Sequence, residues 1–385
     1  MDRVVWFLVV SQRLDPAEPA PRRQPIRHLY VHTPFCAKIC PYCAFYVHTG
    51  SASEMRTFLD ALLREWERVS RDYPVEAETL YLGGGTPSLL PLDAFRRFAE
   101  AFHPWEAIEA TLEANPRTVT PAKAVAWREL GIGRVSLGVQ SLDSEVLRTL
   151  GRRHTAEDVK EAVRTLRDAG FKNINVDLLF AVPGQSPASW HETLGGAIAL
   201  GPEHISAYEL TYEEDTPFFK ARAAGIWTED ENRSIEMYRT AWRLLEDAGY
   251  RQYEISNYAR QGCASRHNQG YWKGNDYLGL GPGACSTVGL CRWQNRRDTE
   301  RYIAALSAGQ DPPREHEPLS EEQRQRERLL LGLRTSGGIP ASWIGGNSDA
   351  ALALTRQGLA ELSEGNFRLT PEGRLLTDGI AGLFV

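Results

Sequence analysis

The chain has 385 residues, long enough for one barrel with an appendage or for two or three average domains. Hydrophobic residues make up 42% of it, which is ample for a buried core, and its net charge of −6 argues against a general nucleic-acid binder. Its six cysteines are too sparse for a disulfide framework, so we expect a reducing compartment and a cytoplasmic protein.

Residues 1–25 are expected to form a tail and a linker. Their apolar run, Val4 to Val10, has seven residues and is far too short to cross a bilayer. The stretch from Asp15 to Pro25 has four prolines in eleven residues, which deny the backbone regular hydrogen bonding. The sequence therefore predicts no transmembrane segment and leaves peripheral membrane association open.

Strand-like and helix-like segments alternate from His28 onward. The clearest helices are Ala156–Ala169, which Thr155 and Asp158 cap, and Glu231–Asp247. This alternation predicts parallel strands joined by right-handed crossovers. Six units rather than eight predict an α/β fold with a partial (β/α)6 barrel of the TIM type, whose chemistry lies at the carboxyl ends of the strands. The predicted strands are His28–His32, Thr79–Leu82, Ala110–Ala114, Arg134–Val139, Ile174–Phe180 and Ile205–Thr211.

Residues 301–385 are expected to form a small winged-helix-like α+β domain. Its first helix, Ser320–Arg334, begins with a capping box of Ser320 and Gln323. Arginines in that helix alternate with glutamates, which predicts a solvent-facing helix and no nucleic-acid partner. The arginines are Arg324, Arg326 and Arg328, and the later elements are a helix near Asp349–Gln357, a strand at Phe367–Leu369 and a helix opening at Thr370.

Three cysteines, Cys36, Cys40 and Cys43, stand in the run TPFCAKICPYCAFY, directly after the first strand. Soft sulfur ligands suit iron–sulfur centres, zinc and copper. Three ligands instead of four leave one metal position open, as in sites that do chemistry. We therefore predict a four-iron cluster held at three irons. A zinc knuckle that uses His48, or simple buried thiols, are the alternatives, although no second CxxC is present.

Polar or flexible residues also follow the next strands. Gly83–Gly85 would let the backbone approach a ligand such as an amino-acid group, and a tight turn is the alternative. Glu113, Gln140 and Asp177 lie at or near the ends of three successive strands. A carboxylate in an apolar strand costs several kcal/mol unless it is paired or bound to a ligand. These groups suit an ammonium or ribose hydroxyls.

Taken together, these motifs resemble the radical S-adenosylmethionine proteins of the oxygen-independent coproporphyrinogen oxidase group, and more closely their heme-chaperone branch. The resemblance implies a barrel over residues 26–225 and an extension over 226–300 that completes the site. It also implies a 4Fe–4S cluster, S-adenosylmethionine, heme, an electron donor, a heme acceptor protein and a monomer or homodimer. The motifs are YVHTPFCAKICPYC, YLGGGTPS, LEANP, GVQS, NINVDLLFAVPGQ, HISAYELT, YEISNYA, RHNQGYW and DYLGLGPGACS.

The same resemblance implies residue roles, without assigning a catalytic residue. The cysteine trio would bind the cluster, and His267 and Cys285 are candidate heme ligands. The residues implied for S-adenosylmethionine are Tyr30, Tyr42, Gly84, Gly85, Thr86, Glu113, Gln140, Arg152, Asp177, Thr211 and Cys285.

Two positions depart from the related patterns. Phe45 stands where the oxidase branch has a fourth cysteine, which favours the heme-chaperone branch, as does the HNxxYW stretch that begins at His267. Cys285 stands where that branch usually has histidine. Either side chain can ligate heme iron, and a small buried filler is the alternative for Cys285.

Three functions compete on this basis. The favoured one is a chaperone that binds heme and passes it to an acceptor. The second is oxidative decarboxylation of coproporphyrinogen III, so whether the chain is an enzyme stays open. The third, a zinc-bound regulator that uses the C-terminal domain on nucleic acid, is disfavoured by the negative charge.

Overall fold

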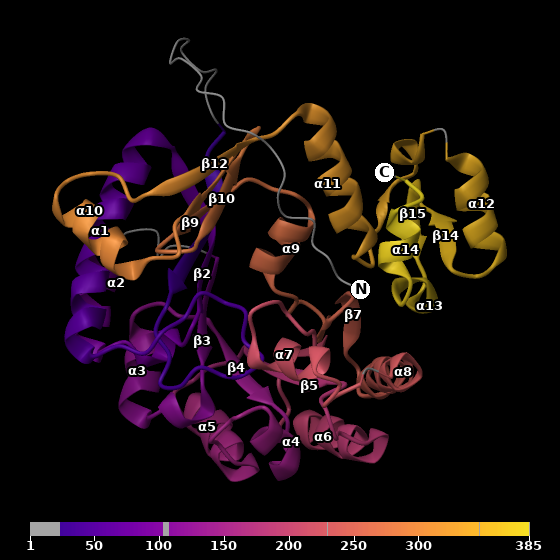
Figure 1. Cartoon of the computed structure of the whole chain (residues 1–385), viewed down its shortest axis with the longest axis horizontal. Coiled ribbons are helices and arrows are strands. Elements are labelled where there is room, and N and C mark those ends of the chain that lie inside the picture. Colours follow the sequence, from indigo (N-terminus) through magenta and orange to yellow (C-terminus); the bar gives the residue numbers. More distant parts are fainter. Residues whose placement is uncertain (1–23, 103–107, 229, 346, 385) are drawn as a thin grey trace.

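The computed structural model describes residues 24–102, 108–228, 230–345 and 347–384 (Figure 1). The expected apolar run Val4–Val10 and most of the expected linker lie outside these residues. None of the helices in these ranges is long and apolar enough to span a membrane.

Within the described residues, a sheet of twelve strands has the order β12-β11-β10-β9-β1-β2-β3-β4-β5-β6-β8-β7. Strands β1 to β6 are parallel neighbours, which confirms the predicted partial barrel. The strands are β1 Ile26–Thr33, β2 Val75–Gly84, β3 Glu109–Ala114, β4 Arg134–Gln140, β5 Ile174–Phe180, β6 His204–Glu209, β7 Arg251–Glu254, β8 Asn257–Ala259, β9 Tyr277–Leu280, β10 Cys285–Val288, β11 Cys291–Asn295 and β12 Arg314–Pro318.

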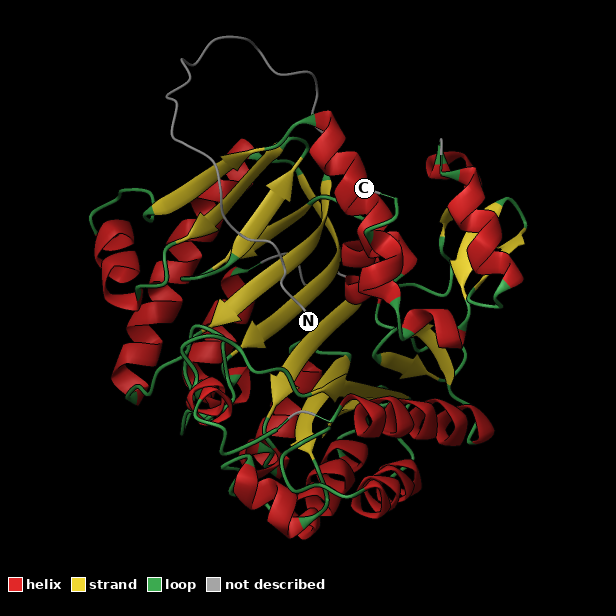
Figure 2. Cartoon of the chain, turned by 45° about the vertical axis from the view of Figure 1, so that its right-hand side comes forward, coloured by secondary structure: helices red, strands yellow, loops and turns green. Residues whose placement is uncertain are grey.

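Helices cover the outer face of this sheet (Figure 2). The capping box of Thr155 and Asp158 is present, as predicted, at the start of α5. The helices are α1 Ala52–Asp72, α2 Leu92–Ala101, α3 Pro121–Glu129, α4 Ser144–Thr149, α5 Ala156–Asp168, α6 Pro187–Ala199, α7 Pro217–Ala223, α8 Glu231–Asp247, α9 Arg266–Trp272 and α10 Thr299–Ser307, with 3-10 turns η1 Pro87–Leu89 and η3 Pro116–Thr118.

Side chains alternate between the two faces of the parallel strands, because successive residues of a strand point to opposite sides. Leu29 and Val31 of β1 join the apolar core under the helices. Their neighbours His28, Tyr30 and His32 lie on the inner face. The same alternation continues across the sheet, so the inner face is largely polar. The apolar residues that face the helices include Leu80, Leu82, Leu112, Val135, Leu137, Val176 and Ile205. The polar residues of the inner face include Thr79, Tyr81, Glu113, Ser136, Asn175, Asp177 and Ser206.

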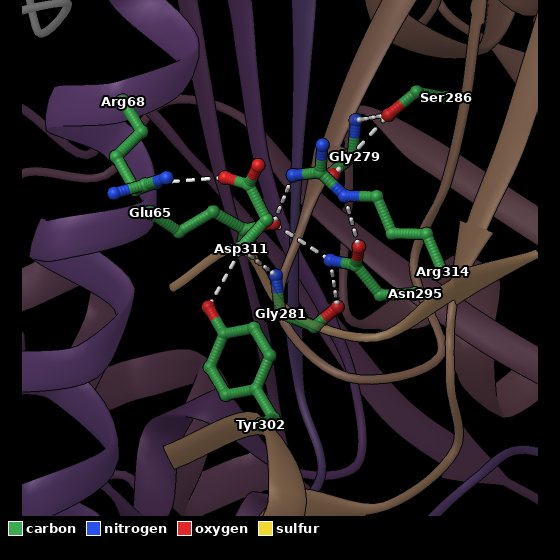
Figure 3. Close-up of polar contacts among 9 residues, drawn as sticks. All are labelled: Glu65, Arg68, Gly279, Gly281, Ser286, Asn295, Tyr302, Asp311 and Arg314. Carbon is green, nitrogen blue, oxygen red and sulfur yellow. Dashed lines mark hydrogen bonds and ion pairs between the residues drawn. The ribbon is translucent and has the colours of Figure 1, made fainter. Parts of the chain in front are cut away.

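An extension of four strands lies beyond β1. Strand β9 runs parallel to β1, and β10, β11 and β12 continue antiparallel. A buried carboxylate, Glu65 of α1, ties this extension to the barrel (Figure 3). It accepts hydrogen bonds from Tyr302 Oη at 2.6 Å, Asn295 Nδ2 at 2.7 Å and Gly281 N at 2.8 Å, and Arg314 Nη2 lies 3.2 Å away. The network fixes the turn that precedes β10.

A second, smaller core forms near the C-terminus around Leu333, Phe367 and Leu369. It packs helices on a three-stranded sheet of order β13-β15-β14, which fits the predicted winged-helix-like domain. The boundaries at residues 226 and 301 stay predictions. The elements are α11 Glu321–Leu333, β13 Ile339–Pro340, η4 Ala341–Ile344, α12 Ser348–Arg356, β14 Ala360–Ser363, β15 Asn366–Leu369, α13 Pro371–Arg374 and α14 Thr377–Ala381.

The interpretation of α11 as solvent-facing is wrong for one arginine. Arg326 is exposed and pairs with Glu322, as expected. Arg324 is only 3% exposed, and it donates to the carbonyl of Gly274 at 2.9 Å and to Asp276 at 3.3 Å. The charge pattern misled here because a charged residue can be buried where a carbonyl and a carboxylate meet it.

Candidate cofactor site

The cysteine loop follows β1 and is closed by its own backbone. The amide of Cys36 donates to the carbonyl of His48 at 2.9 Å, and the amide of His48 donates to the carbonyl of Pro34 at 2.8 Å. Phe35 is fully buried and packs edge-on against Phe58 of α1. The loop is therefore anchored at both ends, and the three thiols it carries are half-buried.

The surroundings of the thiols fit thiolate ligands. The Cys36 Sγ lies 3.6 Å from the Thr86 hydroxyl, and Arg152 Nη1 lies 3.8 Å from the Cys40 Sγ. Burial raises the pKa of Cys36, and it raises the pKa of Cys43 to about 11. Such thiols stay protonated until a metal stabilises the thiolate. Among the described residues, no three His, Cys, Asp or Glu side chains already converge as for a single metal ion.

The glycine segment at the end of β2 lies against the cysteine loop. The amides of Gly85 and Thr86 donate to the carbonyls of Thr33 and Phe35 at 2.7 and 2.8 Å. A Cβ at Gly85 would lie 2.6 Å from the Phe35 carbonyl oxygen. Gly84 has φ +100° and donates its amide to Glu113. The glycines thus permit the close approach of the cysteine loop and not of a ligand. The amides of Gly84 and Gly85 already donate hydrogen bonds within the chain.

Two carboxyl groups on the inner face stand at the predicted positions. Glu113 accepts from the Tyr81 hydroxyl at 2.8 Å and from the Gly84 amide at 3.1 Å. Loss of solvent, and then the nearby charge of Asp177, raise the pKa of Glu113 to about 7. Asp177 accepts from Ser136 and from Asn175, each at 2.8 Å, and burial raises its pKa as well. Both acids would favour a cationic ligand.

Arg152 joins the end of β4 to the cysteine loop. Its Nη2 donates to the carbonyl of Gly138, and its Nη1 reaches the sulfur of Cys40. Gln140 ends the same strand with φ +66°, where the register with β5 shifts. A non-glycine residue rarely adopts this conformation, which is common at functional sites. Arg152 therefore lies beside the cysteine loop, and Gln140 ends the strand whose Gly138 carbonyl Arg152 contacts.

The remaining predicted residues differ in their placement. Tyr30 contacts the His32 imidazole through its hydroxyl at 3.1 Å and stacks on Tyr81. Tyr42 packs against Phe218 of α7. Thr211 is exposed and donates to Glu213 instead of to another predicted site residue. Cys285 is half-buried at the start of β10. Burial is the main reason that the pKa of Tyr30 is raised, and a negative charge on Cys285 would raise it further.

His267 lies in α9, which packs over the inner face (Figure 1). Its Nδ1 is 2.8 Å from the Thr79 hydroxyl, which also meets His28 Nδ1 at 2.9 Å. Burial lowers the pKa of His267 to about 3, so the imidazole is neutral at physiological pH. Its ring lies 5.1 Å from that of Tyr81. Tyr81 therefore contacts both a candidate heme ligand and Glu113.

Sequence reasoning missed most of the polar inner face. The signal was present as polar residues at every second position of the strands, which an apolar-run search does not detect. Arg134 begins β4 on this face and is 2% exposed. The other missed residues include His28, His32, Thr79, Tyr81, Ser136, Asn175, His204, Ser206 and Asn257.

The chain is similar to known proteins along most of its length. The radical SAM superfamily model matches residues 30–195, and the HemN C-terminal domain model matches residues 319–376. The heme chaperone HemW of Bacillus subtilis is 30% identical over 376 residues, covering 94% of this chain and 99% of that protein. The heme chaperone HemW of Synechocystis is 35% identical, and the match covers 80% of this chain and 78% of that protein. The coproporphyrinogen III oxidase HemN of Escherichia coli shares the fold at 23% identity. Its TM-score is 0.80, and the match covers 94% of this chain and 91% of that chain.

Proposed function

Because the chain belongs to the family of the heme chaperone HemW, within the radical SAM superfamily, we propose that it binds heme and delivers it to an acceptor protein. The observation that carries the proposal is 30% identity to such a chaperone along nearly the whole of both chains. The cysteine loop supports it, since Phe45 replaces the fourth cysteine of the oxidase pattern and is 69% exposed. We place the protein in the cytoplasm, as a monomer or homodimer, with an electron donor as second partner.

Cys36, Cys40 and Cys43 would hold the 4Fe–4S cluster that membership of the superfamily implies. Such a cluster, when bound, supplies an open coordination position and an electron for S-adenosylmethionine. The chain contributes a loop anchored by backbone hydrogen bonds, and it places the Arg152 guanidinium and the Thr86 hydroxyl beside two of the sulfurs. A cation and a hydroxyl in these places offset the negative charge that thiolates bring to a cluster.

The S-adenosylmethionine would lie along the carboxyl ends of β2 to β5. Glu113 and Asp177 supply negative charge for its cationic groups or acceptors for its ribose hydroxyls. Gln140 and Arg152 flank the same region. Roles in this site for Tyr30, Tyr42, Gly84, Gly85, Thr86, Thr211 and Cys285 are part of the proposal.

The segment of residues 226–300 would complete the heme site, because it carries His267 and Cys285. His267 could ligate the heme iron. It is neutral, and Thr79 occupies its Nδ1, so Nε2 is the nitrogen that would meet the iron. Cys285 is the second candidate, and burial raises its pKa.

A second function, decarboxylation of coproporphyrinogen, has the fold similarity to HemN in its favour. One experiment separates the two. Anaerobically purified protein is given coproporphyrinogen III, S-adenosylmethionine and a reductant, and, in parallel, its heme-loaded form is mixed with an apo-hemoprotein. We expect heme transfer and no protoporphyrinogen. Robust formation of protoporphyrinogen without heme transfer would overturn the chaperone function.

A further inference from the structure

The inner face contains one buried cation that the proposed roles leave unexplained. Arg134 is the first residue of β4 and is 2% exposed. Its side chain makes no hydrogen bond, and no ion pair within 4 Å, with any residue that the structure describes. Its Nε is enclosed and unpaired.

An unpaired guanidinium in this position is costly. Arginine does not lose its proton in proteins, so it cannot escape the penalty as a buried lysine would. Removing a charge from water costs several kcal/mol unless a partner compensates it. This residue therefore has an unmet need for an anion.

The acids around Arg134 are committed elsewhere. Glu113 accepts from Tyr81 and Gly84, and Asp177 accepts from Ser136 and Asn175. Glu109 accepts from the Ser265 hydroxyl and from the first amides of α9. The charges of Glu113 and Asp177 interact with Arg134, but none of the three acids provides the bidentate contact that a guanidinium prefers.

The register of the sheet gives the depth of Arg134. It stands opposite Thr111, whereas Ser136 stands opposite Glu113. Arg134 is therefore two residues, or about 6–7 Å, further from the carboxyl ends of the strands than Glu113. Its charge also reaches His204 and His267, although burial is the main cause of the lowered pKa of both. Arg134 thus lies on the side of the site that contains His267, away from the cysteine loop.

We infer that Arg134 receives a carboxylate of the bound heme. This inference rests on the proposed chaperone function and adds to it the group by which the porphyrin is oriented. The ionised groups of the porphyrin are its propionates, and a planar carboxylate matches the fork of a guanidinium. S-adenosylmethionine also has a carboxylate, but its proposed place is at the strand ends near Gly84 to Thr86.

The test compares ferric heme with ferric heme dimethyl ester, in which both propionates are blocked. Dissociation constants for both ligands are measured for the wild type, R134Q and R134K, with R164Q as a control on the exposed face of α5. We expect the wild type and R164Q to prefer free heme by about tenfold or more. R134Q should lose that preference, and R134K should keep part of it. If R134Q does not fold, R134K alone still reports a reduced preference.

Five results would overturn the inference. R134Q could keep the full preference for free heme, or it could weaken heme and its diester equally, which indicates a structural role. It could instead lose affinity for S-adenosylmethionine while the heme preference stays, which assigns Arg134 to that carboxylate. A wild type that binds heme without any preference refutes the inference alone. A wild type that binds neither porphyrin refutes the proposed function as well.

Discussion

The hydroxyl of Tyr81 donates a 2.8 Å hydrogen bond to the carboxyl group of Glu113. The ring of Tyr81 also lies 5.1 Å from the imidazole of His267. One side chain of β2 therefore contacts the acid proposed for S-adenosylmethionine and the candidate heme ligand. Glu113, whose pKa is about 7, is the titratable group in this contact whose charge changes near physiological pH.

Binding of S-adenosylmethionine should strengthen as pH rises. Glu113 carries its negative charge only above its pKa of about 7, and a cationic ligand favours the charged form. Affinity should therefore increase between about pH 6 and pH 8. The E113Q variant should bind weakly and without this dependence. Calorimetric titrations across the pH range, on anaerobic protein, measure it. A flat profile for the wild type would contradict the role of Glu113.

Removing the Tyr81 hydroxyl should move that pH dependence. The hydrogen bond from Tyr81 stabilises the carboxylate and so lowers the pKa of Glu113. In Y81F the midpoint of S-adenosylmethionine binding should move to higher pH, with the ring contact to His267 kept. The same titrations test this, and T57A on the exposed face of α1 is the control. A midpoint that falls or does not move refutes it.

Substitution of Gly85 by alanine should disturb the cysteine loop. The added Cβ would lie 2.6 Å from the Phe35 carbonyl oxygen and 2.8 Å from that of Thr33, and backbone cannot yield as a side chain can. G85A should therefore lower both iron content and S-adenosylmethionine affinity. The control G195A lies in α6 with nothing within 4 Å, and it should raise stability by about 0.5–1 kcal/mol. Full iron content in G85A would show that the loop tolerates the change.

The carboxylate of Glu65 should be essential to the stability of the extension. E65A would leave the donors of Tyr302, Asn295 and Arg314 without their acceptor (Figure 3). Breaking such a buried charged network typically costs about 3–5 kcal/mol. R68A, which removes an exposed pair with Asp311, should change little. Urea unfolding measures both. Equal and small effects would mean that the network contributes specificity and not stability.

Sequence reasoning succeeded for the barrel because its parallel strands are long and their connecting helices are amphipathic. Strands β1 to β6 and helices α5 and α8 lie at the predicted positions. Strands β9 to β12 were missed, since each has only four or five residues, β9 contains Gly279 and β12 consists mainly of charged residues. Their place depends on Glu65, which is more than 200 residues away in sequence.

The predicted site came from residues at the strand ends, where the topology itself brings them together. The cysteine loop, Glu113 and Arg152 are neighbours through Gly84 and Cys40. The polar inner face was not predicted, because each polar residue there alternates with an apolar one that faces the helices. Arg134 gave no signal in the sequence, since only the structure reveals that it is buried and that its side chain makes no hydrogen bond with a described residue.

Iron and acid-labile sulfide per chain, measured after anaerobic reconstitution, show whether the cysteine trio holds a cluster. We expect about four of each in the wild type. They should be lost in C36A, C40A and C43A, and kept in C263A and C291A, whose thiols lie outside the loop. One zinc per chain with no sulfide, or full iron content in a variant of the trio, would contradict it.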